Sequence, residues 1–436
     1  MGGSSREVIA KPSVSLLRMT GCLTSAVDLV SRSLVDHQSR VAYIAYSLSG
    51  AMGLPADQRR VILLAGLLHD IGALSLQERL DALVFDSDRG PIERHCVHGY
   101  LLLRVFAPFR GVAQIVRHHH TRWDEVGRLV ARGLDVPEAS HVIHLADRVA
   151  VVLGSQKGVL GQAPGVMEGI LPERGREFNP DVVDALRELA EKEYFWLEAA
   201  SPSISRTVVG MPPAGQEELD LDGMLGVAKL FAKVIDFRSS FTATHSWGVA
   251  AVAAGMASSV GFSEDECRLM EVAGYLHDVG KLAVPAEILE KPGQLTEEER
   301  SVIRAHSYCT YHVLEQMEGL EPLAQWAAFH HERLDGTGYP FHLTRRELPL
   351  GSRIMTVADV FTALTEDRPY RGGLRGEEAL DIVRRLARER ALDPLVVDVL
   401  EATYEGLNLA RERAQAAASE EYRDLWRAYE EEPAGG

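Results

Sequence analysis

The sequence is poor in the residues that mark secreted, nucleic-acid-binding or membrane proteins. Only four of its 436 residues are cysteine, with no Cys-x-x-Cys pair and no regular disulfide spacing. Such sparse thiols are typical of a reduced, cytoplasmic protein. Basic residues are also scarce, because 46 Lys and Arg stand against 63 Asp and Glu, for a net charge of −17. This balance excludes binding of a DNA or RNA duplex through a broad basic face, although metals and a few local cations would still allow a small anionic substrate.

Long apolar runs are missing as well. The longest weakly apolar stretch, residues 246–262, is short, rich in Ala, Gly and Ser, and directly follows His245. A membrane-spanning helix needs about 20 predominantly apolar residues, so this stretch predicts a buried helix instead. The amino terminus also lacks the charged, apolar and small-residue regions of a signal peptide. We therefore expect a cytoplasmic protein with no membrane partner.

The same ordered set of histidines and aspartates occurs twice along the chain. In each set, a His-Asp pair follows another histidine by 32 residues. A further histidine comes next, a His-His pair stands 24 residues beyond it, and an Ala-Asp pair closes the set. The first set consists of His37, His69, Asp70, His95, His119, His120 and Asp147. The second set consists of His245, His277, Asp278, His306, His330, His331 and Asp359.

The two sets account for ten of the 16 histidines. A single histidine on an apolar stretch is usually a satisfied core residue, but core packing does not explain an ordered set that is repeated. Imidazole and carboxylate groups are suitable ligands for zinc, manganese and iron. Each set therefore predicts a metal site, and the repeat indicates two related domains in tandem.

The coarse secondary structure is predicted to be helical. Apolar residues recur at intervals near 3.6 in residues 61–68 and 378–387, and no long alternating strand pattern appears. Thr296 followed by Glu299 predicts a capped helix start, and Gly280 is predicted to end the helix of its His-Asp pair. The sequence thus predicts an all-α fold with ligands from separate, converging helices. Pro and Gly residues at 201–216 predict a linker between domains at 1–200 and 217–436.

Two segments of the second copy resemble a known family. They are His277-Asp278-Val-Gly-Lys281 and the segment from His330-His331 to Gly-Tyr339-Pro. With them, the region from about residue 236 to 404 resembles the HD-GYP family. Members of this family are bacterial phosphodiesterases that act on cyclic di-GMP and, in some cases, on 3′,3′-cyclic GMP-AMP. The resemblance implies that this chain is such an enzyme of second-messenger signalling.

The resemblance also implies roles for single residues. The second set of histidines and aspartates would hold two divalent metal ions, of iron or manganese, with Asp278 bridging them. Asp278 and Lys281 would be catalytic, and the substrate would be bound by Lys281, Tyr339, Arg368 and Arg371. Some members bind a third metal through a glutamate where this chain has Phe241, so we expect two ions here.

A two-metal site suits the hydrolysis of a phosphodiester. Two metal ions lower the pKa of a shared water from near 15.7 towards roughly 7, and they neutralise the phosphate oxygens. Asp278 is able to bridge them because a carboxylate has two oxygens. Arginine side chains such as Arg368 and Arg371 suit forked contacts to phosphate.

The first copy resembles the wider HD superfamily but lacks the phosphate-binding residues. Ala73 stands in place of the lysine, and no Gly-Tyr-Pro segment follows its His-His pair. Gln156 and Val159 stand where the second copy has its two arginines. We therefore predict that the first copy is a degenerate, regulatory HD domain with a vestigial metal site. It would act through contact with the second domain.

Two other functions fit part of the pattern. An HD-type phosphohydrolase of another nucleotide or phosphate ester would use the same ligands, but the Gly-Tyr-Pro segment and the arginine pair argue against it. A non-catalytic, metal-stabilised signalling scaffold fits the first copy better than the second. The sequence does not choose between cyclic di-GMP and 3′,3′-cyclic GMP-AMP, and it leaves a homodimer open.

Overall fold

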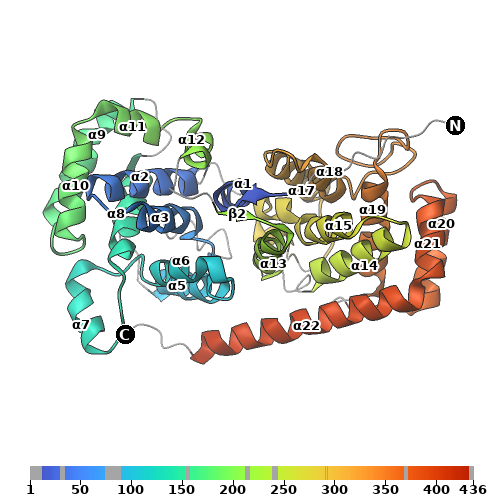
Figure 1. Ribbon diagram of the computed structural model, residues 1–436. Helices are drawn as coiled ribbons and strands as arrows, with labels where there is room; N and C mark the ends of the chain where they lie inside the picture. Colours follow the sequence, from blue (N-terminus) through green and yellow to red (C-terminus); the bar gives the residue numbers. More distant parts are fainter. Residues whose placement is uncertain are drawn as a thin grey trace. The chain divides into compact units, whose positions relative to one another are not determined.

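The fold is that of a computed structural model, drawn as a ribbon in Figure 1. It describes residues 12–29, 35–73, 90–153, 158–211, 217–237, 244–289, 291, 293–367 and 372–431, without the side chains of 90–93 and 237. Among these residues, all regular structure is helical except two strands of two residues each. The predicted all-α fold is therefore confirmed.

The chain forms two compact units, and the amino-terminal unit contains the first copy of the repeat. It consists of Leu17–Glu217 with the short segments Pro285–Glu287 and Tyr422–Gly436. At its centre, α2 (His37–Ala51) packs against α3 (Ala56–Leu68) and α8 (Glu138–Leu153). Its other helices are α1 (Leu16–Asp28), α5 (Gly90–Leu103), α6 (Arg110–Arg117), α7 (Val126–Ala131), α9 (Val159–Ile170), α10 (Pro180–Ala190), α11 (Glu193–Ala199) and α12 (Ile204–Gly210). Short 3-10 turns are η1 (Ala107–Phe109), η2 (Trp123–Glu125) and η3 (Leu171–Glu173).

The carboxy-terminal unit contains the second copy. It consists of Met1–Leu16, Glu218–Val284 and Ile288–Glu421. At its centre, α14 (His245–Ser259) packs against α15 (Glu264–Leu276) and α19 (Leu350–Thr365). Its other elements are β1 (Val14–Ser15), β2 (Glu218–Leu219), α13 (Leu221–Phe237), η4 (Val279–Ala283), α17 (Glu297–Leu314), α18 (Glu321–Ala328), α20 (Gly376–Arg388) and α21 (Pro394–Ala402). The helices α16 (Ala286–Leu289) and α22 (Tyr404–Glu431) have residues in both units. The strands pair antiparallel, with Val14 opposite Leu219.

Both units use a glycine to bring two ligand-bearing helices close together. A Cβ on Gly66 of α3 would lie 2.5 Å from the Cα of Ala42 in α2. A Cβ on Gly274 of α15 would lie 2.4 Å from the Cα of Ala250 in α14. Any larger residue would push these helices apart. Each glycine stands three residues before the histidine of its His-Asp pair, so the close crossing positions both copies of the site.

Two local predictions have different outcomes. Thr296 forms a capping box with Glu299 at the start of α17, as predicted. Gly280 does not end a helix, because α15 ends at Leu276 and Gly280 lies inside η4. A Cβ on Gly280 would lie 2.0 Å from the carbonyl oxygen of His306. This glycine therefore allows η4 to lie against α17, which carries the third ligand histidine.

The weakly apolar stretch forms α14, most of whose residues are buried in the carboxy-terminal unit, as predicted. Nowhere in the described part of the chain is a helix both long and apolar enough to cross a membrane. The segment predicted as a linker contains α12, in which Ile204 and Val208 are buried. The domain bounds stay a prediction.

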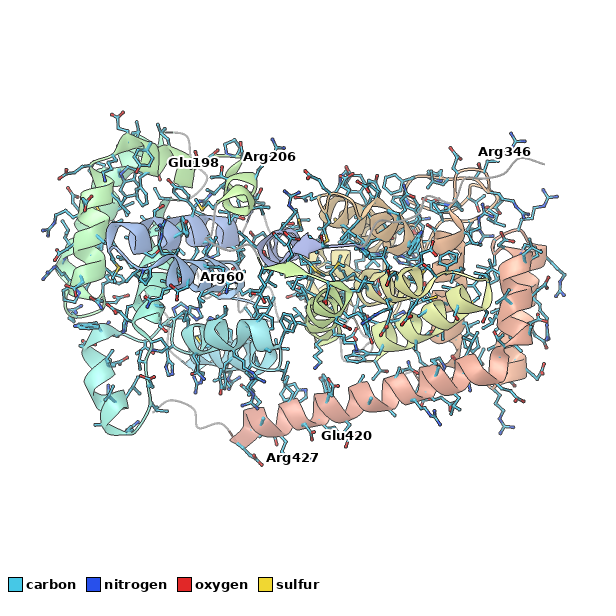
Figure 2. All side chains as sticks on the ribbon, in the orientation of Figure 1. Arg60, Glu198, Arg206, Arg346, Glu420 and Arg427 are labelled. Atoms are coloured by element: carbon cyan, nitrogen blue, oxygen red, sulfur yellow. The ribbon has the colours of Figure 1, made fainter. Side chains whose placement is uncertain are left out.

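The surface of each unit is rich in charged side chains. Arg346 and Glu420 lie exposed in the carboxy-terminal unit, and Arg60 lies at the surface of the amino-terminal unit (Figure 2). The Nη1 atom of Arg60 is 2.9 Å from the Oε2 atom of Glu217. Exposed pairs of this kind contribute little to stability, roughly 0–1 kcal/mol each. Surface ion pairs of this kind therefore say little about the protein, and the buried charged residues of each unit are more informative about function.

Candidate metal centre

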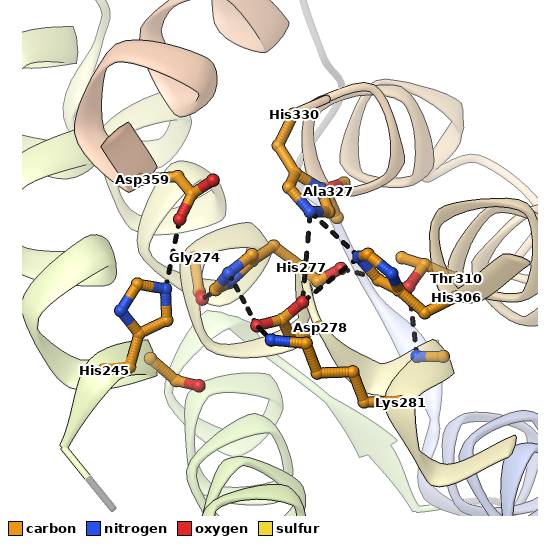
Figure 3. A network of polar contacts seen from close by, with 12 residues as sticks. His245, Gly274, His277, Asp278, Lys281, His306, Thr310, Ala327, His330 and Asp359 are labelled. Atoms are coloured by element: carbon orange, nitrogen blue, oxygen red, sulfur yellow. Dashed lines mark hydrogen bonds and ion pairs between the residues drawn. The ribbon is translucent and has the colours of Figure 1, made fainter. Parts of the chain in front are cut away.

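The structure brings the seven predicted ligands of the second copy together from five parts of the carboxy-terminal unit (Figure 3, in which all of them except His331 are labelled). His245 begins α14, His277 and Asp278 follow α15, and His306 lies within α17. His330 and His331 follow α18, and Asp359 lies within α19. Their side chains form three overlapping groups that could each hold a metal ion: His306 with His330 and His331, His245 with His277 and Asp359, and His277 with Asp278 and His330.

Asp278 lies at the centre of these groups. Its Oδ2 atom is 3.2 Å from the Nε2 atom of His277. Its Oδ1 atom is 3.3 Å from the Nε2 atom of His306 and 3.9 Å from that of His330. The two carboxylate oxygens thus face different histidines, which is the arrangement that a bridging ligand needs.

Backbone hydrogen bonds orient three of the ligand imidazoles. The Nδ1 atoms of His277, His306 and His330 lie 2.8, 2.6 and 2.6 Å from the carbonyl oxygens three residues earlier, of Gly274, Ile303 and Ala327. Because a carbonyl only accepts, each Nδ1 carries the hydrogen and each Nε2 keeps its lone pair.

The lone pairs of two of these imidazoles face each other. The Nε2 atoms of His306 and His330 are 3.2 Å apart, and two lone pairs cannot form a hydrogen bond. A metal ion at about 2.1 Å from both nitrogens fits this spacing. The Nε2 atom of His277 is buried and has no hydrogen-bond partner in the described part of the chain, which also fits a metal ligand.

The protonation states suit metal binding. Burial lowers the pKa of His306 to about 3 and that of His330 well below its usual value, so both imidazoles are neutral. Burial alone would raise the pKa of Asp278, but His277 and Lys281 hold it well below its ordinary range. His306 and His330 therefore offer neutral nitrogens and Asp278 offers an ionised carboxylate, as a divalent ion requires.

Glu366 is a part of this centre that the sequence prediction missed. Its Oε2 atom is 3.0 Å from the Nδ1 atom of His245, whose Nε2 atom is 3.1 Å from the Oδ1 atom of Asp359. Burial lowers the pKa of His245, but Glu366 and Asp359 outweigh it and raise that pKa to about 10. A carboxylate behind a histidine ligand fixes the ring and increases its basicity.

Two of the four residues predicted to bind substrate, Lys281 and Tyr339, lie beside the metal ligands. The Nζ atom of Lys281 is 2.6 Å from the Oδ2 atom of Asp278. The ring of Tyr339 lies 4.8 Å from that of His331, centroid to centroid. The guanidinium of Arg304 lies 4.7 Å from the centroid of the Tyr339 ring and is a cation that the sequence prediction missed. Arg368, Arg371 and Phe241 lie outside the described residues, as does Gln156 of the first copy.

The segment that carries Tyr339 is fixed by the residue after the His-His pair. The side chain of Glu332 is buried, and it accepts hydrogen bonds from the backbone N–H groups of Phe341 at 2.7 Å and Leu343 at 2.9 Å. The N–H of Tyr339 donates to the carbonyl of His331 at 3.2 Å. Hydrogen bonds within residues 331–343 therefore hold Tyr339 next to the predicted ligand His331.

The first copy repeats this geometry around Asp70. Its Oδ2 atom is 3.3 Å from the Nε2 atom of His69, and its Oδ1 atom is 3.3 Å from that of His95 and 3.8 Å from that of His119. The Nε2 atom of His37 is 3.3 Å from Oδ1 of Asp147. His120 joins His95 and His119 in a second possible metal group.

Comparison with known proteins agrees with this architecture. Residues 229–396 and residues 34–151 each match a family model of the HD domain. A 3′3′-cGAMP-specific phosphodiesterase of Vibrio cholerae, number 1, is 32% identical over 414 residues, which cover 92% of this chain and 94% of that protein. The chain belongs to the HD-GYP family.

Two further HD-GYP relatives are similar over different lengths. The cyclic di-GMP phosphodiesterase response regulator RpfG of Xanthomonas campestris is 40% identical over 171 residues, or 39% of this chain and 45% of that protein. A solved structure from V. cholerae is titled as a cyclic GMP-AMP specific phosphodiesterase (V-cGAP3). It matches with a TM-score of 0.62 and 25% identity, over 90% of this chain and 98% of that chain. The match to this solved structure thus extends over both HD domains of the chain.

Glu366 provides a test of this HD-GYP centre. We expect Glu366→Ala to weaken metal binding by about 10- to 100-fold, because outer partners of histidine ligands typically have effects of this size. Glu366→Gln keeps an acceptor for the Nδ1–H group, so its loss should be smaller. Competition with a chelator would measure both changes. Glu347→Ala removes an exposed carboxylate that bonds only Thr344 among the described residues, and this control should leave the affinity unchanged. Equal affinities in all variants would contradict the assigned role.

Proposed function

We propose that this HD-GYP protein is a metal-dependent phosphodiesterase that hydrolyses cyclic dinucleotides, cyclic di-GMP or 3′,3′-cyclic GMP-AMP, in its carboxy-terminal unit. The observation that carries the proposal is the gathering of the seven ligand side chains in overlapping groups, with the ammonium of Lys281 beside Asp278. The relatives named as phosphodiesterases support it, and the match to the Vibrio cholerae enzyme covers 92% of this chain. The cytoplasmic location belongs to the same proposal.

We assign two divalent ions, of iron or manganese, to the seven ligands of the carboxy-terminal unit. Once bound, they would supply a hydroxide at neutral pH and neutralise the negative charge of the phosphate. The two oxygens of Asp278, which face different histidines, support the assignment of this residue as a ligand shared by both ions. His306 and His330 stay neutral through burial, so they bind metal without cancelling its charge.

The remaining residues bind and orient the substrate. Lys281 places an ammonium group beside Asp278, where it would hold a phosphate oxygen of the scissile bond. The Tyr339 ring, next to His331, offers an aromatic face to a base or sugar. Arg304 lies over that ring and adds a cation for the second phosphate, a contact that we also assign to Arg368 and Arg371. A dinucleotide with two phosphates fits these separated cations better than a simple phosphate ester.

We assign regulation, and no hydrolysis, to the amino-terminal unit. Ala73 is buried where the other copy has Lys281, so this position offers no ammonium group to a phosphate. Val159 is likewise apolar, where the other copy has an arginine. Contact between the domains and formation of a homodimer are further parts of this proposal.

The proposal is tested by a hydrolysis assay of the purified, metal-loaded full chain. Cyclic di-GMP and 3′,3′-cyclic GMP-AMP would be compared side by side, with a mononucleotide monoester and a simple aryl phosphate as controls. We expect turnover of at least one cyclic dinucleotide and far slower turnover of the controls. Faster hydrolysis of the controls would favour a general HD-type phosphohydrolase. No hydrolysis by metal-loaded, folded protein would favour a signalling scaffold.

A further inference from the structure

The amino-terminal unit differs from the catalytic copy at the ligand histidine His95. The next residue is Cys96, where the other copy has Ser307 after His306. Both side chains are buried, and the Sγ atom of Cys96 lies 3.7 Å from the Nε2 atom of His95. A thiol therefore stands among the imidazoles of a site that contains only nitrogen and oxygen donors in the other copy.

Four side chains form one candidate group here: His95, Cys96, His119 and His120, which we call the thiolate cluster. Each offers a ligand atom, and these atoms all lie within 4.8 Å of one another. The Nε2 atoms of His95 and His119 are 3.2 Å apart. The Nδ1 atom of His119 bonds the carbonyl of Val116 at 2.7 Å, so its Nε2 atom keeps a lone pair. The Nε2 atom of His120 is shielded from solvent and has no hydrogen-bond partner among the described residues.

Two of these spacings fit a tetrahedral ion. Zinc binds nitrogen at about 2.0–2.1 Å and thiolate sulfur at about 2.3 Å, which places tetrahedral nitrogens roughly 3.4 Å apart and sulfur roughly 3.6 Å from nitrogen. The observed distances of 3.2 Å between nitrogens and 3.7 Å from sulfur to nitrogen agree with this geometry. A thiolate also favours zinc over the harder manganese and magnesium ions.

The other half of the amino-terminal site is less suited to an ion. Arg148 is buried next to Asp147, with its Nη2 atom 2.6 Å and its Nε atom 3.1 Å from the same carboxylate oxygen. The residue after Asp359 in the catalytic copy is Val360. A fixed guanidinium thus neutralises Asp147 and repels a cation on that side. We infer that the amino-terminal unit holds a single zinc-type ion in the thiolate cluster, in place of a two-metal hydrolytic centre.

Cobalt spectroscopy of the full chain tests this inference. Tetrahedral Co²⁺ replaces zinc, and a bound thiolate adds a sulfur-to-cobalt charge-transfer band in the near ultraviolet. We expect this band in the metal-stripped protein reloaded with Co²⁺, and its loss in Cys96→Ser. Cys309→Ser should keep the band, because Cys309 belongs to no metal group of the described residues. Serine occupies the equivalent position in the other unit, so Cys96→Ser should fold, and circular dichroism checks this.

A zinc titration against a chromophoric chelator gives a second measurement. Cys96→Ser should lower the zinc affinity of the tightest site by at least about tenfold, whereas Asp278→Asn should leave that site unchanged. If Cys96→Ser does not fold, His120→Ala retains the thiol and should keep the band while changing the visible cobalt spectrum. The inference is overturned if the wild-type protein has no band, if the band survives in Cys96→Ser, or if His120→Ala leaves the spectrum unchanged. Cyclic dinucleotide hydrolysis is measured separately, so an active enzyme without the band would overturn this inference alone.

Discussion

Replacing Asp278 by asparagine should abolish hydrolysis of cyclic dinucleotides, with a fall in kcat of about 10³-fold or more. Asparagine keeps the size of the side chain but loses the charge and one of the two oxygen donors that face His277 and His306. The metals' contribution to catalysis is worth several kcal/mol, and each 1.36 kcal/mol is tenfold in rate. Steady-state kinetics together with metal analysis of the purified variant would measure the effect.

Asp70→Asn is the matched control, because Asp70 has the same position among the histidines of the amino-terminal unit. The chemistry is assigned to the other unit, so this variant should keep the reaction and its substrate. A changed thermal stability is compatible with this expectation. The assignment of the two copies would be reversed if folded Asp70→Asn lost all activity while Asp278→Asn kept it.

The ligand sets are within reach of sequence reasoning because they are repeated. The order of histidines and aspartates is the same in both copies, and the structure gathers all members of each set. Helical periodicity likewise predicts the fold class, since apolar residues recur near every 3.6 positions and the strands are only two residues long. The repeat makes the ligand sets recognisable because the same pattern can be compared between two copies within a single chain.

Glu366 shows what a sequence pattern leaves out. It stands seven residues after Asp359, about two helical turns, so the two side chains lie on one face of α19 and its end. An acidic residue at a helix end is usually solvated, and only the packing of α14 on α19 brings it to the Nδ1 atom of His245. The role of Arg304 is equally hard to predict from the sequence. Its contact with Tyr339 depends on how the turn that carries Tyr339 packs against α17, which carries Arg304.

Cys96 and Arg148 were missed for another reason. Each directly follows a ligand in the sequence, and successive residues of a helix point about 100° apart, so a neighbour of a ligand usually faces elsewhere. Comparison of the two copies position by position does reveal both, as Cys96 against Ser307 and Arg148 against Val360. That comparison shows a difference but gives no distance, and the distances identify the thiol as a possible ligand.

Lys281→Ala should slow hydrolysis by about 10²- to 10³-fold, the usual cost of removing one group that stabilises charge in a transition state. The ammonium lies 2.6 Å from Asp278, in the centre of the site. Lysine is not a metal ligand there, so the metal content should be unchanged. The loss should therefore fall mainly on kcat, with a smaller change in KM.

Lys291→Ala is the control for a general effect of removing positive charge. Lys291 pairs with Glu299 at 2.7 Å, outside the metal groups, and its replacement should leave kcat within about twofold of the wild type. Lys281→Arg tests the role further, since arginine restores the charge but not the compact ammonium, and it should recover only part of the rate. Loss of metal from Lys281→Ala would show that the lysine maintains the ligand geometry. Unchanged turnover would show that its ammonium serves only to neutralise Asp278.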